Sequence, residues 1–82
     1  MKNTQNNRLM AAKVPVLEEW AARLDPASPK LAAYFRQTAE WIRKGLEHGT
    51  GFDGWDAGRT EKKVDTMLEI AQLLLQEWEE AR

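Results

Sequence analysis

The sequence contains few of the side chains that most often carry out chemistry in proteins. His48 is the only histidine, and there is no cysteine. General acid–base catalysis by His48 would need a partner in a pocket, but the neighbouring Glu47 would point about 100° away on a helix. We interpret His48 as a helix-end residue near the negative end of the helix dipole. The lack of cysteine excludes disulfides, zinc–thiolate sites and thiol nucleophiles within this chain.

Residues 49–58 are the most unusual passage, with four glycines and two aromatic residues among ten positions. The passage lacks the lysine of a Walker loop and the three-glycine spacing of a dinucleotide fingerprint. The loop that contains Asp53 and Asp56 lacks the alternating acidic residues that bind the ion in a calcium loop. We therefore interpret both residues as turn and cap residues. We therefore expect no metal, no cofactor and no small-molecule substrate, and we expect that the protein is not an enzyme.

Nucleic-acid binding would require a basic surface. Arg36, Arg43 and Lys44 share the outer face of a predicted helix, but Glu40 and Glu47 lie among them. The net charge of −1 offers no general attraction for a polyanion. A nucleic-acid-binding regulator that uses these three basic residues is the alternative hypothesis for function, and a solvated helix face is the simpler interpretation.

Length and composition indicate one soluble domain. The chain has 82 residues, of which 43% are hydrophobic and 30% are charged, which is close to an ordinary globular protein. Its longest apolar run, residues 73–75, is far shorter than the roughly 20 residues of a membrane span. The N-terminal residues contain no apolar signal segment. We expect a single cytoplasmic domain over residues 1–82, with no membrane association.

Pro15 decides where the first helix is expected to begin. Proline is suited to the first helical position, so we predict a helix over 15–24, preceded by a mobile segment, residues 1–14. A kinked helix over 8–24 is the alternative. The apolar residues expected to face inward from the first helix are Leu17, Trp20, Ala21 and Leu24.

A second helix is expected over 29–48. Ser28 is a strong N-cap candidate, Pro29 fits the first helical position, and Gly49 would end the helix as a left-handed cap. The short link between the first two helices predicts a helical hairpin. The residues expected to face inward from the second helix are Leu31, Tyr34, Phe35, Thr38, Ile42 and Leu46.

The longest helix is predicted over 60–81, with Asp56 or Thr60 as its cap. No glycine or proline interrupts this run, and most of its residues are good helix formers. The fold prediction is therefore all-α: a small three-helix bundle made of a helical hairpin and a long C-terminal helix. The inward-facing residues of this helix are predicted to be Val64, Met67, Leu68, Ala71, Leu74, Leu75 and Trp78.

Two apolar residues do not fit the inward stripe of this last helix. Ile70 projects roughly 100° from the centre of the stripe, and Leu73 roughly 160°. The apolar surface is therefore wider than one neighbouring helix covers. Either this helix is central in the bundle and contacted on both flanks, or it makes a second contact with another chain, which we favour. Leu74 would join this contact, and Trp41, at the edge of its own stripe, could join as well. The aromatic residues of the loop over 49–58 either cover the end of the bundle or contact the partner.

The sequence thus predicts a small protein–protein interaction module, acting as a regulator, inhibitor or assembly factor. It would form a homodimer or dock on a larger protein partner by burying apolar helix surface. The residues predicted to contact the partner are Trp41, Phe52, Trp55, Ile70, Leu73 and Leu74.

Overall fold

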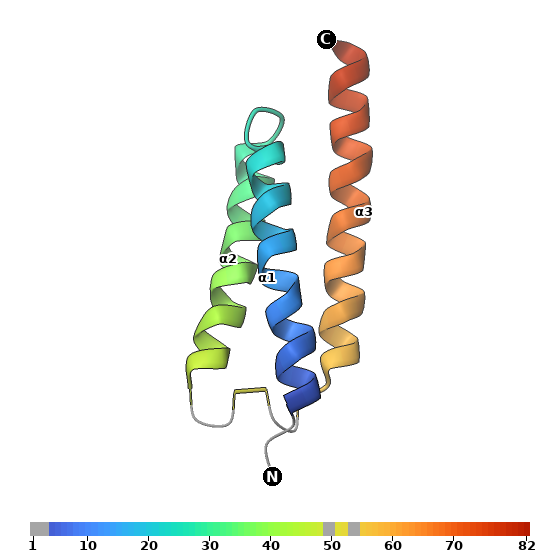
Figure 1. The fold of residues 1–82 in the computed structure, drawn as a ribbon. Coiled ribbons are helices and arrows are strands. Elements are labelled where there is room, and N and C mark those ends of the chain that lie inside the picture. Colours follow the sequence, from blue (N-terminus) through green and yellow to red (C-terminus); the bar gives the residue numbers. More distant parts are fainter. Residues whose placement is uncertain (1–3, 49–50, 53–54) are drawn as a thin grey trace.

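The computed structural model describes residues 4–48, 51–52 and 55–82, and this part of the chain is all-α. It contains three helices: α1 (Thr4–Leu24), α2 (Pro29–Glu47) and α3 (Ala57–Ala81). Figure 1 shows that α1 and α2 form an antiparallel hairpin and that α3 lies alongside α1. The contact of α1 with α3 is less extensive than its contact with α2, and α2 and α3 barely touch. The predicted all-α chain with a helical hairpin is confirmed.

The first helix begins at Thr4 rather than at Pro15, which lies inside α1. The expected mobile segment, residues 1–14, is thus helical from Thr4 onward. Pro15 removes one helical hydrogen bond because it has no N–H, which would normally break a helix. Met10 and Val14 are buried in the core just before it, and their burial offsets this cost. The alternative of a helix that passes through Pro15 is therefore closer to the structure.

The turn between α1 and α2 follows the predicted capping chemistry. The Ser28 hydroxyl accepts a hydrogen bond from the Leu31 N–H at 3.3 Å, which confirms Ser28 as the N-cap. The Ser28 N–H in turn donates to the Leu24 carbonyl at 2.7 Å. At its other end α2 stops at Glu47, one residue before the predicted end. The predicted cap residue Gly49 lies outside the described residues.

The third helix starts at Ala57, earlier than the predicted start at residue 60. Of the two candidate caps, Asp56 is the one used: its carboxylate accepts a hydrogen bond from the Arg59 N–H at 3.3 Å. Figure 1 shows that α3 extends past the α1–α2 turn, so its C-terminal end projects beyond the hairpin. The molecule is accordingly elongated, with extents of 52 × 19 × 14 Å.

The core is formed by the inner faces of all three helices and one loop residue. Small residues contribute to this core, and Ala32 and Ala39 of α2 are fully buried. Tyr34, predicted to face inward, is instead 42% exposed, because it lies about 100° from Phe35, which is near the centre of the buried face of α2. The buried hydrophobic residues are Met10, Val14, Leu17, Ala21, Leu24, Ala32, Phe35, Ala39, Ile42, Phe52, Val64, Met67, Ala71 and Leu75.

Candidate functional site

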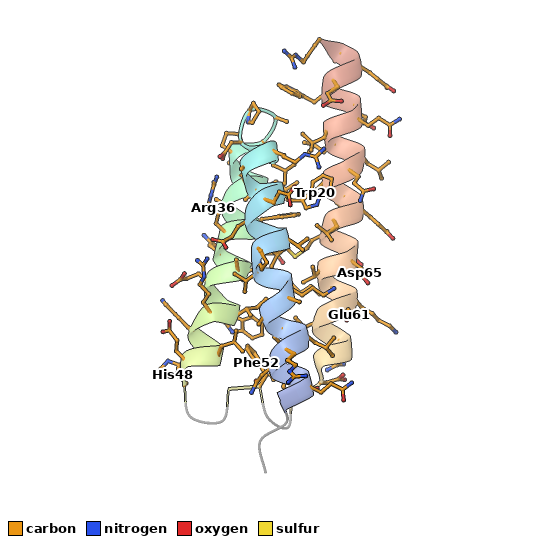
Figure 2. The ribbon with its side chains drawn as sticks, in the orientation of Figure 1. Trp20, Arg36, His48, Phe52, Glu61 and Asp65 are labelled. Carbon is orange, nitrogen blue, oxygen red and sulfur yellow. The ribbon has the colours of Figure 1, made fainter. Side chains whose placement is uncertain are left out.

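Three aromatic residues that are far apart in the sequence form one cluster. Trp41 of α2 meets Phe52 with 5.5 Å between ring centroids and Trp55 with 5.6 Å, and Phe52 and Trp55 are 6.1 Å apart. All three pairs have edge-to-face geometry, which contributes about 0.5–1.5 kcal/mol per pair beyond simple burial. The cluster lies at the end of the hairpin opposite the α1–α2 turn, where Figure 2 labels Phe52.

Phe52 is the buried member of this cluster. Its side chain is 5% exposed and packs directly on the backbone of Gly45, where an added Cβ would lie 2.8 Å from the ring atom Cε2. Trp41 and Trp55, by contrast, remain 46% and 45% exposed. The two loop aromatics therefore differ in burial: Phe52 covers the end of the core, and Trp55 stays accessible. Phe52, one of the residues predicted to contact a partner, is thus buried and packs against both tryptophans.

The loop that carries these aromatics is held by two asparagines of α1. The Asn7 side-chain oxygen accepts a hydrogen bond from the Phe52 N–H at 2.8 Å. The Asn6 side-chain amide donates to the Trp55 carbonyl, also at 2.8 Å. Gly51 adopts φ +62°, the left-handed conformation that favours glycine, beside the Asn7 side chain. Sequence patterns do not reveal this anchor, because both asparagines fall within the expected mobile segment, residues 1–14.

The two exposed tryptophans line a groove between α2 and α3. Its volume is about 310 Å³. The Trp55 indole N–H donates to the Thr60 hydroxyl at 2.8 Å, which fixes the ring at the edge of α3. Lys63 lies over the Tyr34 ring, with Nζ 5.6 Å from its centroid. This aromatic groove, which also contains two cations, is lined by Thr38, Trp41, Trp55, Arg59, Thr60 and Lys63.

A second accessible surface lies on α3, outside the core. Ile70 is 50% exposed and Leu73 is 62% exposed, the largest exposed fraction among the exposed large hydrophobic residues. Leu74, grouped with them from the sequence, is half-buried and packs against the core. Of the three α3 residues predicted to contact a partner, two are thus accessible in the structure and the third is mostly engaged within its own chain.

Two of the three basic residues of the nucleic-acid hypothesis, Arg36 and Arg43, form ion pairs with residues of α1 and of the α1–α2 turn. Arg36 donates to both carboxylate oxygens of Asp25, and this hydrogen bonding holds the pKa of Asp25 below its ordinary value. Arg43 pairs with Glu18 of α1 and also approaches Glu40 at 3.9 Å. Lys44, nearby, is exposed. Because two of the three cations already face carboxylates, this surface has little net positive charge to offer a polyanion.

Residues 4–48, 51–52 and 55–82 contain no group of three or more potential metal-ligating side chains. None of their helices is both long and apolar enough to cross a membrane. Comparison with known proteins does not assign a function either: no family model, curated protein or solved structure matches the chain.

Proposed function

We propose that this protein is a small helical protein-interaction module that works by burying the outer face of α3 against another protein chain. The observation that carries the proposal is the exposure of Ile70 and Leu73 on a helix whose opposite face already packs on α1. Single exposed apolar residues are ordinary on protein surfaces. These two are consecutive members of one helical face, with a spacing of three residues, so one neighbouring helix can cover both.

The energetic gain from covering this face is moderate. Full burial of an isoleucine or leucine side chain contributes about 1.5–3 kcal/mol, and each of these residues is already partly shielded by its own helix. A contact based on Ile70 and Leu73 alone would therefore be weak and reversible. Additional contacts are needed for tight binding, and the aromatic groove is lined by residues of the same helix about two to four turns towards its N-terminus.

The aromatic groove supplies the second contact region. Tryptophan is enriched among the residues that dominate binding energy at protein interfaces. Trp41 and Trp55 are held rigidly by Phe52 and by the hydrogen bond to Thr60, so little side-chain entropy is lost when a partner covers them. A chain that covers both regions would be regulated, inhibited or assembled through this module.

The proposal is tested by replacing Leu73 with a photoreactive amino acid in the cells that naturally express the protein. After irradiation, we expect a covalent adduct to a protein chain, identified by mass spectrometry. The matched control carries the same photoreactive residue at Gln72, which is also exposed but points about 100° away on α3. Adduct formation at Leu73 well above that at Gln72 supports the module. Equal or absent protein adducts at the two positions would refute it.

A further inference from the structure

The outer face of α3 carries a second regular stripe besides the one that packs on α1. Its members follow one another at alternating steps of four and three residues, the spacing by which helices pair in a coiled coil. All of them are exposed. We call this set the outer stripe: Arg59, Lys63, Thr66, Ile70, Leu73, Glu77 and Glu80.

Charge is distributed unevenly along the outer stripe. Its N-terminal end carries the cations Arg59 and Lys63, its middle carries the two apolar residues, and its C-terminal end carries the anions Glu77 and Glu80. This order opposes the helix dipole, which favours anions near the N-terminus and cations near the C-terminus. The first turn of α3 contains no acidic residue and its last turn contains no basic residue. The order of charges along the outer stripe is thus electrostatically unfavourable, and a partner of opposite charge order would relieve this.

A second copy of α3 in the antiparallel orientation has that charge order. If Ile70 lies on the two-fold axis, Lys63 comes opposite Glu77 of the other copy, because each is seven residues from Ile70. The steps of four and three also bring Arg59 opposite the second copy's Glu80. Every charged member of the stripe then faces a residue of opposite sign, and the antiparallel dipoles attract one another.

We propose that the occupant of this face is a second copy of the same chain, bound as an antiparallel α3–α3 pair in this register. The inference rests on the proposed interaction function and names the partner and its geometry. The apolar centre is formed by Ile70 against its symmetry mate and by Leu73 against Thr66. A parallel pair is disfavoured because it would set cations beside cations at one end and anions beside anions at the other.

The pairing also connects the outer stripe to the aromatic groove. Arg59 and Lys63 belong to both surfaces, since they line the groove with Trp41 and Trp55. In the antiparallel pair the acidic end of the partner's α3 reaches this point. Each copy therefore uses its groove to receive the end of α3 that projects past the hairpin of the other (Figure 1).

Disulfide trapping tests the register of the α3–α3 pair. Because the sequence contains no cysteine, any disulfide must involve the introduced residues. We would prepare the variants Lys63→Cys, Glu77→Cys and Ile70→Cys, all at exposed positions where folding is not at risk. Under mild oxidation we expect Ile70→Cys to form a disulfide-linked dimer with itself. We expect a mixture of Lys63→Cys and Glu77→Cys to form the mixed dimer in preference to either homodimer. Gln72→Cys is the exposed control and should remain monomeric.

The alternatives have distinct outcomes. Homodimers of Lys63→Cys and of Glu77→Cys without the mixed dimer indicate parallel pairing and overturn the inference, while the interaction function survives. Trapping of Gln72→Cys as efficient as that of Ile70→Cys overturns it as well, because the contact is then non-specific. If no variant is trapped, the second copy is not the partner. The photo-adduct at Leu73 then decides separately whether another protein occupies the face.

Charge reversal gives an independent check. Lys63→Glu alone and Glu77→Lys alone each place two like-charged pairs in the dimer, and we expect dimerisation about tenfold weaker in each. The double variant Lys63→Glu/Glu77→Lys restores opposite charges across the interface and should recover the wild-type affinity. A double variant as weak as either single variant would contradict the assigned pairing.

Discussion

Phe52 is the residue on which the geometry of the aromatic cluster depends. Its ring fills the end of the core against Gly45 and presents edge-to-face contacts to both exposed tryptophans. Its own backbone is held by Asn7 of α1. Sequence patterns left open whether Phe52 covers the end of the bundle or contacts a partner. The space beside Gly45, which only a residue without a Cβ provides, is the feature that decides it.

Gly45→Ala should destabilise the protein despite the better helix propensity of alanine. The new Cβ collides with the Phe52 ring, and overpacking of this kind costs about 1–3 kcal/mol, more than the gain of about 1 kcal/mol from propensity. Gly58→Ala is the control, because its Cβ would only contact the Asp56 carboxylate at 3.4 Å. Urea unfolding should show a lower midpoint for Gly45→Ala and an equal or higher one for Gly58→Ala. A stabilised Gly45→Ala variant would mean that Phe52 does not occupy this position.

The ion pair between Asp25 and Arg36 predicts a pH dependence. The hydrogen bond from Arg36 lowers the pKa of Asp25 below its ordinary value of 3.8, with a smaller contribution from charge attraction. The stabilisation from this pair is therefore present above that ordinary pKa and is lost as the pH falls through the lowered one. An NMR titration should show the pKa of Asp25 rising towards its ordinary value in Arg36→Gln. An unchanged pKa in this variant would exclude the pair in solution.

At the scale of elements, the sequence predicted the three helices well because capping and periodicity are local properties. Ser28 and Asp56 were identified as cap candidates from residue type and position alone, and both cap helices in the structure. The beginning of α1 was missed because the rule for proline describes an isolated helix. Burial of Met10 and Val14 against other elements outweighs that local preference.

Pro15→Ala should stabilise the protein. Proline inside a helix is about 3 kcal/mol less favourable than alanine, and about 1 kcal/mol of this is returned because proline restricts the unfolded chain. The expected net gain is about 2 kcal/mol, measured as a higher urea midpoint. Pro29→Ala is the matched control and should give no gain, because Pro29 begins α2, where its fixed φ is favourable. Equal effects of the two substitutions would argue against a helix that continues through Pro15.

The candidate site was predictable only in part, because helical periodicity describes the helices but not the path of the loop between them. The outward positions of Ile70 and Leu73 follow directly from helical periodicity, and both are exposed. The meeting of Trp41 with Trp55 depends on how the loop returns to α2, which periodicity does not describe. The anchoring of that loop by Asn6 and Asn7 joins residues more than 40 positions apart in the sequence, so no local pattern reveals it.

At the scale of the whole molecule, the arrangement of α3 is the unusual feature. It packs on α1, barely touches α2 and projects past the α1–α2 turn. A helix in this position has one face committed to its own chain and another face free, and in our account that free face carries the outer stripe. The hairpin reaches this face at the N-terminal end of α3, where Arg59 and Lys63 line the aromatic groove with Trp41. We infer that a second chain covers the rest.

Self-association through this face is the central claim, and sedimentation equilibrium over a range of micromolar concentrations tests it most directly. We predict that the apparent mass of the wild type rises with concentration from 9.4 kDa towards twice that value. Leu73→Asp should stay at the monomer mass throughout, because an aspartate at the apolar centre would be buried without a partner, whereas Gln72→Asp should behave like the wild type. A wild-type chain that keeps the monomer mass at every concentration, with Leu73→Asp indistinguishable from it, would contradict the account.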